Sequence, residues 1–116
     1  MPAYIKVMNL NKEQMAEVAK NTLSNIAQIA GQEPESEFHF IHCSDLIFDN
    51  DSTPFVYIEI SWFARNMKKM QGVSKLLYDE ISKYGNCNVN VVFQELKLMG
   101  NLFENGEWYW SKPRNF

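Results

Sequence analysis

Proline at position 2 has a chemistry that depends on the residue before it. The chain begins MPAYIKVMN, and proline suits the first residue of a strand because it lacks a backbone N–H and has a fixed φ. Removing Met1 would turn its amide nitrogen into a secondary amine. A free α-amino group titrates at about 7.7–8.0, and burial favours its neutral form. Pro2 is therefore either a conditional general base or simply the start of a strand.

Arg65 is the second candidate because of its place between two predicted elements. It follows the strand-like segment FVYIEISWF and precedes a helix that is predicted to begin near Asn66. A cation at a helix N-terminus is disfavoured by the helix dipole unless an anion joins it. The sequence therefore predicts that Arg65 binds a substrate carboxylate. A solvated loop arginine and an intersubunit salt bridge remain open alternatives.

Metal binding is not predicted from the histidines or cysteines. His39 and His42 are three residues apart in a predicted strand, so their side chains point to opposite faces. Cys43 and Cys87 follow no CxxC spacing, and we expect both to be free thiols. The segment DNDS lacks the glycine and the late glutamate of a calcium loop. We expect no metal and no cofactor.

Apolar spacing predicts a strand and a helix in each half of the chain. The segment from Ala3 to Asn9 alternates like a strand, and a helix follows, with Asn11 as N-cap, Gln14 three residues later, and Gly31 near its end. The segments EFHFIHC, FVYIEISWF and NVNVVFQEL predict three further strands. The first helix is expected to bury Met15, Val18, Ala19, Thr22, Ile26 and Ile29, and the second Met70, Val73, Leu77, Ile81 and Tyr84.

Two copies of a βαβ unit describe this order economically. We expect a single domain over 1–116, with units at 2–43 and 54–95, a loop at 44–53 and a tail at 96–116. Parallel pairing within each unit gives an α/β (α+β) fold: a four-stranded sheet with both helices on one face. A ferredoxin-like domain also reads βαββαβ and is the alternative fold.

The tail and the second-unit strand indicate surfaces for other subunits. Asn105-Gly106 predicts a type I′ hairpin turn, followed by a strand with Trp108 and Trp110 on one face and Tyr109 on the other. Both faces of FVYIEISWF are largely apolar, although helices can cover only one of them. We expect the uncovered face and the tryptophans to meet neighbouring subunits. Alternatively, the tryptophans cover the sheet of their own subunit.

Composition excludes several classes of protein. The 116 residues carry a formal net charge of -3, and the basic residues are scattered, so we expect no nucleic-acid partner. The beginning of the sequence lacks the apolar stretch of a signal peptide, and no apolar run is long enough for a membrane span. We expect a cytoplasmic protein without a membrane partner.

The sequence resembles the tautomerase superfamily, which includes oxalocrotonate tautomerase and macrophage migration inhibitory factor (MIF). The resemblance lies in three features: a strand that begins at Pro2, two βαβ units of about equal length, and the tail. More narrowly, PFVYIEISWFAR resembles a small tautomerase-like family of unknown function. The resemblance implies a MIF-like fold, a homotrimer, and an amino-terminal proline that acts as base or acid on small carboxylate substrates. It also implies carboxylate binding by Arg65, with Lys12 as its first-unit counterpart, and a polar pocket residue at Asn90.

We therefore predict a tautomerase-like protein that catalyses keto-enol tautomerisation or a related proton transfer if Met1 is removed. A non-enzymatic oligomeric binding or structural protein of the same fold is the main alternative, in which Lys12 and Asn90 are ordinary surface residues. A ferredoxin-like ligand-binding dimer is the third possibility.

Overall fold

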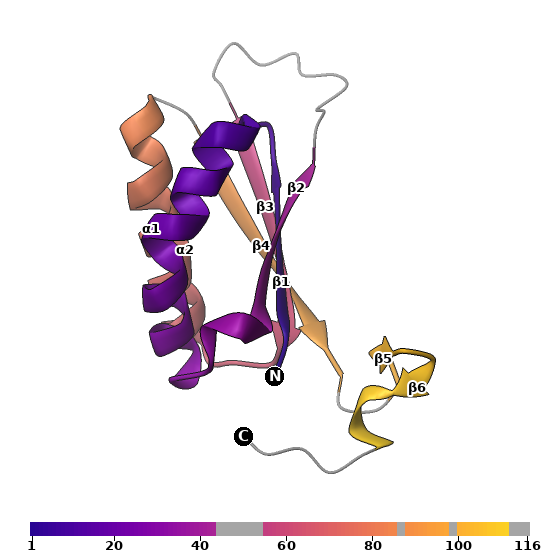
Figure 1. The fold of residues 1–116 in the computed structure, drawn as a ribbon. Coiled ribbons are helices and arrows are strands. Elements are labelled where there is room, and N and C mark those ends of the chain that lie inside the picture. The colour runs from indigo at the N-terminus through magenta and orange to yellow at the C-terminus, as the bar shows by residue number, and fades with distance from the viewer. Residues whose placement is uncertain (44–54, 86–87, 98–99, 112–116) are drawn as a thin grey trace.

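A four-stranded sheet and two helices form the body of the molecule. The computed structural model describes residues 1–43, 55–85, 88–97 and 100–111. The sheet has the order β2-β1-β3-β4, and both helices cover one of its faces (Figure 1). The strands are β1 Ala3–Met8, β2 Phe38–Cys43, β3 Phe55–Phe63 and β4 Asn88–Leu96, and the helices are α1 Lys12–Gly31 and α2 Met67–Ile81.

Strand pairing confirms the two βαβ units. β1 pairs with β2 in parallel, β3 pairs with β4 in parallel, and the two units meet where β1 and β3 run antiparallel. In a ferredoxin-like domain each βαβ unit is split by another strand, whereas here the two strands of each unit are direct neighbours. The predicted α+β class is confirmed, and the ferredoxin-like alternative is wrong.

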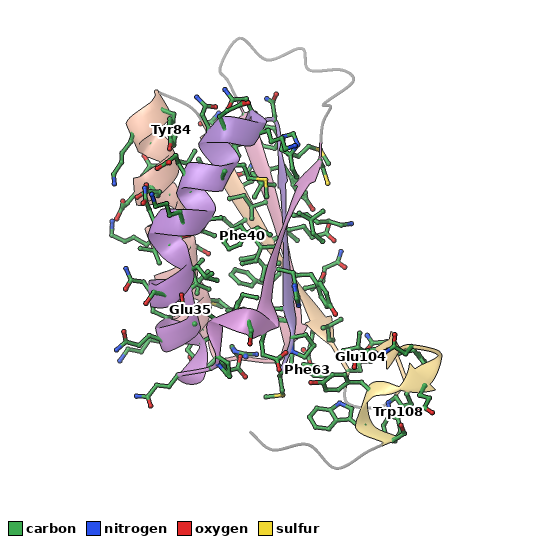
Figure 2. All side chains as sticks on the ribbon, in the orientation of Figure 1. Glu35, Phe40, Phe63, Tyr84, Glu104 and Trp108 are labelled. Carbon is green, nitrogen blue, oxygen red and sulfur yellow. The ribbon has the colours of Figure 1, made fainter. Side chains whose placement is uncertain are left out.

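The core lies between the helix layer and the sheet. Ile5, Ile58 and Ile60 are fully buried on the covered face, and each contributes about 1.5–3 kcal/mol by leaving water. Phe40 extends from β2 into the same layer (Figure 2). Tyr84 was expected on the buried face of α2, and this prediction is wrong because α2 ends at Ile81. Tyr84 lies in the short 3-10 helix η2 Ser82–Tyr84 and is exposed.

An asparagine begins each helix. The side chain of Asn11 accepts a hydrogen bond from the Gln14 backbone N–H at 2.7 Å, and the Gln14 side chain accepts one from the Asn11 backbone at 3.4 Å. This confirms the predicted capping box. The Asn66 side chain accepts a hydrogen bond from the Lys69 backbone N–H at 2.9 Å, which confirms the predicted start of α2.

The second face of the sheet is covered by neither α1 nor α2. Tyr57, Glu59 and Ser61 of β3 lie on it and are half-buried, while Ile41 of β2 and Val92 of β4 are exposed. This face is mixed in character rather than purely apolar. It is the face that the sequence predicts to meet neighbouring subunits.

The predicted hairpin turn is confirmed. Strands β5 Phe103–Glu104 and β6 Glu107–Trp108 pair antiparallel, with φ 55° at Asn105 and φ 82° at Gly106. In Figure 1 the hairpin stands apart from the helix layer, beyond the end of β4.

The prediction of a strand through Trp108, Tyr109 and Trp110 is correct for Trp108 and wrong for the other two residues. The chain turns into the 3-10 helix η3 Tyr109–Ser111, so these side chains do not alternate across a strand. Tyr109 is buried, and its ring centroid and that of Trp110 lie 6.1 and 5.6 Å from that of Phe63. Within the subunit, Tyr109 and Trp110 therefore cover the end of β3, which agrees with the alternative for Trp110; for Trp108 it stays a prediction. Figure 2 shows Phe63 beside this part of the tail.

Several predictions fall outside the described residues. They concern the loop at 44–53 with its DNDS segment, the thiol of Cys87 and the end of the tail at 112–116. Cys43 has a free thiol. Among the described helices, none is long and apolar enough to cross a bilayer.

Candidate functional site

The topology brings Pro2 and Arg65 to the same end of the sheet. Pro2 directly precedes β1 and Arg65 follows β3, and the antiparallel register places Ala3 opposite Trp62. The end of α1 and the beginning of α2 meet at this end as well (Figure 1). Pro2 itself is buried.

A cavity of about 430 Å³ opens at this end of the sheet. It is lined by Met1, Ala30, Gly31, Gln32, Glu33, Pro34, Glu37, Ala64, Arg65 and Lys69. Three positive groups therefore line it, namely the terminal amine and the side chains of Arg65 and Lys69, against the two carboxylates of Glu33 and Glu37. Such a cavity is large enough for a small molecule and favours a singly charged anion.

Arg65 is held by groups of its own chain. Its Nε donates a hydrogen bond to the Ala30 carbonyl at 3.0 Å, its Nη1 donates to the Phe63 carbonyl, and its Nη2 forms a salt bridge with Glu33. The guanidinium also lies 4.8 Å from the centroid of the Trp62 ring. With its side chain only 5% exposed, Arg65 is not a solvated loop arginine. The ion pair that it makes here is within the chain.

Glu33 links Arg65 to the terminus of the chain. One carboxylate oxygen of Glu33 pairs with Arg65, and the other lies 3.5 Å from the Met1 nitrogen. The Glu33 side chain is 13% exposed, so both contacts lie in a partly dehydrated place where charges interact more strongly than in water. The result is a continuous series of three charged groups along one wall of the cavity.

The last turn of α1 depends on cations from the second unit. It contains no basic residue, and its Ala30 carbonyl accepts hydrogen bonds from Arg65 Nε and, at 3.3 Å, from Lys69 Nζ. Positive charge at a helix C-terminus is favourable because the helix dipole is negative there. Arg65 and Lys69 therefore join the two helices at the cavity.

Lys12 and Asn90 lie at the opposite end of the sheet. Lys12 is exposed at the beginning of α1, and Asn90 pairs in register with Tyr57, which is itself opposite Met8 at the far end of β1. Six residues of β1 separate that end from Pro2, a distance of about 20 Å. Within one subunit the structure does not bring Lys12 or Asn90 to the cavity.

Tyr4 is the ionisable group near this end with a shifted pKa. Burial raises the pKa of its phenol, and the carboxylates of Glu104 and Glu37 raise it further. The Tyr4 ring stacks on that of His39, with centroids 5.4 Å apart. Tyr4 therefore remains neutral and able to donate a hydrogen bond at physiological pH. Within the described parts of the chain, no group of three or more His, Cys, Asp or Glu residues could hold a metal ion.

Glu33, Glu37 and Lys69 are site residues that the sequence reasoning missed. Glu33 follows the end of α1 in the acidic segment GQEPESE, which has neither apolar periodicity nor a motif. Its partner Arg65 is 32 residues away in the sequence. The one available signal was the concentration of carboxylates directly after a predicted helix.

The fold is shared with proteins of known structure. It is that of the tautomerase/MIF proteins: a MIF homologue from Prochlorococcus marinus superposes with a TM-score of 0.70 at 17% identity, over 92% of this chain and 97% of its own. Pt0534, in a structure of the form inactivated by 2-oxo-3-pentynoate, superposes with a TM-score of 0.69 at 13% identity, over 93% of this chain and 96% of its own.

The family is narrower than the fold. A domain from Sebaldella termitidis, described as a domain of unknown function (DUF1904), is 24% identical with a TM-score of 0.78, over 90% of this chain and 96% of its own. The DUF1904 family matches residues 1–107, and this chain belongs to it. No curated protein sequence matches the chain.

Proposed function

We propose that this chain catalyses keto-enol tautomerisation, or a related proton transfer, on a small carboxylate substrate. After removal of Met1, the Pro2 amine is the general base and Arg65 binds the carboxylate. The reaction needs no cofactor. The proposal includes the cytoplasmic location that the sequence predicts.

One observation carries this proposal: the start of the chain lies against a cavity that combines positive charge with room for a small molecule. Met1 lines the cavity of about 430 Å³, and Pro2 is buried next to it. Loss of Met1 would place a secondary amine at this wall. Burial disfavours the charged form of an amine, which favours a base that works near neutral pH.

The substrate class follows from the charges of the cavity. Arg65 precedes α2 and Lys69 lies in its first turn, and a carboxylate beside them would also be favoured by the helix dipole at the N-terminus of α2. A substrate carboxylate would share the Arg65 guanidinium with Glu33, because Glu33 already occupies one edge of it. We expect a monocarboxylate with an enolisable carbonyl group.

The proposal also includes a homotrimer. The second sheet face exposes Ile41 and Val92 beside polar groups, which suits contact with another subunit. Lys12 and Asn90 lie about 20 Å from Pro2 in their own subunit. They contribute to a substrate site only if a neighbouring subunit brings that end of its sheet to the cavity.

The direct test compares the wild type with Pro2→Ala after intact mass has shown that Met1 is absent. We expect turnover of phenylpyruvate to fall about 10²–10⁴-fold in Pro2→Ala, the range typical of a lost general base. Lys68→Gln is the matched control, since Lys68 is exposed and does not line the cavity. Equal rates for Pro2→Ala and wild type, or Met1 retained in the native protein, would overturn the proposal.

A covalent probe gives a second readout that does not depend on turnover. The neighbour Pt0534 is inactivated by 2-oxo-3-pentynoate, an alkynyl 2-oxo acid that shares the carboxylate and the 2-oxo group of phenylpyruvate. The Pro2 amine would add to the triple bond, forming a carbon–nitrogen bond while the proton moves from nitrogen to carbon, with no leaving group. We expect one added molecule per chain, located on Pro2 by peptide mass. Equal labelling of Pro2→Ala at other positions would contradict this.

A non-enzymatic binding protein is the second candidate, and a specific observation favours it. Arg65 is already engaged by Glu33 and by two backbone carbonyls, as expected of a structural arginine. This candidate predicts that small carboxylates bind in the cavity without turnover, and that Pro2→Ala binds them as wild type does.

A further inference from the structure

We propose that Glu33 is the counter-ion of the Pro2 amine in the chain without Met1, and that Arg65 acts on this amine as a positioning residue through Glu33. The inference deepens the proposed function and rests on it in one respect: it takes Pro2 as the terminal residue. It does not depend on which substrate is used, or on whether turnover occurs.

The first step of the argument is the contact already present at the terminus. Glu33 Oε1 lies 3.5 Å from the Met1 nitrogen while Glu33 Oε2 pairs with Arg65 Nη2. Arg65 is in turn held by the carbonyls of Ala30 and Phe63. The Glu33 carboxylate is therefore fixed from one side, and its other oxygen faces the end of the chain.

The second step concerns the position of the amine after Met1 is lost. One residue spans at most about 3.6 Å, so the new terminal nitrogen lies no more than about 7 Å from Glu33 Oε1 even if nothing moves. Loss of the Met1 side chain and backbone also vacates the space between them. The new terminal residue is held on one side only, so its amine can close the remaining gap by rotation about ψ while Glu33 keeps its contact with Arg65.

The third step is the balance of charge around this amine. Two carboxylates line the cavity from the segment after α1, those of Glu33 and Glu37. Two cations line it from the second unit: Arg65 in the turn before α2 and Lys69 in the first turn of α2. Arg65 and Lys69 both donate to the Ala30 carbonyl, which holds their charge toward the end of α1. Glu33 is therefore the carboxylate best placed to face the amine. A facing carboxylate favours the ammonium form, so Glu33 sets the pH at which Pro2 becomes a free base.

The experiment measures this protonation directly. Protein without Met1, verified by intact mass, is acylated at the terminal amine over a range of pH, because only the free base reacts. We expect the midpoint of this profile to lie about one pH unit lower in Glu33→Gln than in wild type. Glu35→Gln is the matched control: Glu35 is exposed in the same segment and does not line the cavity, so its midpoint should equal that of wild type.

A second measurement covers the case in which Glu33→Gln fails to fold. In the wild type, the carboxyl ¹³C chemical shift of Glu33 should change at the same midpoint as the amine of Pro2. The inference would be overturned if the ¹³C chemical shift of the Glu33 carboxyl group did not change over the pH range in which the Pro2 amine titrates. Identical midpoints in wild type and Glu33→Gln would also overturn it.

The two proposals fail in different ways. If Pro2→Ala retains full turnover while Glu33→Gln shifts the amine titration, the catalytic role of Pro2 is wrong and the counter-ion role of Glu33 stands. If Pro2→Ala is inactive and Glu33→Gln titrates as wild type does, the catalytic role stands and the counter-ion role is wrong.

Discussion

The two turns that lead from strand to helix have the same length but opposite chemistry. In the first unit β1 ends at Met8 and three residues precede α1, and in the second unit β3 ends at Phe63 and three residues precede α2. Each turn ends in an asparagine N-cap. Leu10 therefore occupies the position that Arg65 occupies in the second unit, and Lys12 lies two residues beyond it.

This comparison teaches that the repeat supplies a scaffold rather than a duplicated site. Leu10 is buried with 8% of its surface exposed and extends the hydrophobic core, whereas Arg65 connects Glu33 to the end of α1. Because β1 and β3 run antiparallel, the two equivalent turns lie at opposite ends of the sheet. A hollow at the first end is lined by Asn9, Leu10, Asn11, Lys12 and His42, whereas the cavity at the other end is lined by the charged side chains of Arg65, Lys69, Glu33 and Glu37.

Replacing Arg65 with leucine, the residue at the equivalent position of the first unit, should have the largest effect on the difference between the two turns. Arg65→Leu leaves Glu33 with only the terminal amine as an ion-pair partner and removes two hydrogen bonds to backbone carbonyls. We expect the free energy of unfolding to fall by about 3 kcal/mol, measured by urea denaturation. Lys68→Leu, which removes an exposed cation from the first turn of α2, should change it by less than about 0.5 kcal/mol. If Arg65→Leu were as stable as wild type, Arg65 would not be the link between the helices.

The asparagine caps offer a test of what the two turns share. Asn11→Ala and Asn66→Ala each remove one side-chain acceptor for the first turn of a helix, so we expect each to cost about 1 kcal/mol in thermal unfolding. Asn25→Ala, at an exposed position within α1, should be neutral or slightly stabilising because alanine favours helices. A loss confined to one of the two caps would show that the turns are not equivalent scaffolds.

A smaller effect is expected where the two units meet through their helices. Glu80 of α2 accepts hydrogen bonds at 2.7 Å from Lys83 and from Asn21 of α1, and these bonds hold the pKa of Glu80 below its usual value near 4.5 despite its burial. A carboxyl with a lowered pKa in the folded state stabilises the fold above its unfolded pKa, and this contribution is lost as the pH falls through the folded value.

We therefore expect the wild type to lose more stability than Glu80→Gln does as the pH falls below the usual pKa of a glutamate, near 4.5. The difference should stay below about 1 kcal/mol, since Lys83 is largely exposed and its charge is screened by solvent. Chemical denaturation at several pH values measures it. Parallel pH profiles for the two proteins would show that Glu80 does not stabilise the contact between the units.

Local patterns were sufficient to predict most of the architecture. The asparagine followed by glutamine at the start of α1 predicted its capping box, and Asn105-Gly106 predicted a turn with two positive φ angles. Alternating and β-branched residues predicted the strand β3, although not which of its two largely apolar faces enters the core. Each of these signals acts over a few residues, and therefore can be seen in the sequence alone.

The site was less predictable because its contacts join distant segments. Pro2 and Arg65 were found through a chemical argument and a resemblance, but nothing local shows that Glu33 lies between the terminus and Arg65. The prediction for Tyr109 and Trp110 in the tail was wrong for a similar reason. Alternation predicted a strand through Trp110, whereas the burial of the Tyr109 ring beside Phe63 accompanies a 3-10 turn.

The inward-facing terminus has a consequence for preparing this protein. Because Met1 lines the cavity and its amine pairs with Glu33, an affinity tag or fusion partner placed before Met1 removes the terminal charge and lies beside the cavity. A preparation tagged in this way would carry an obstructed pocket and no amino-terminal proline. Inactivity measured with such material would be an effect of the tag and would not test the activity of the protein itself.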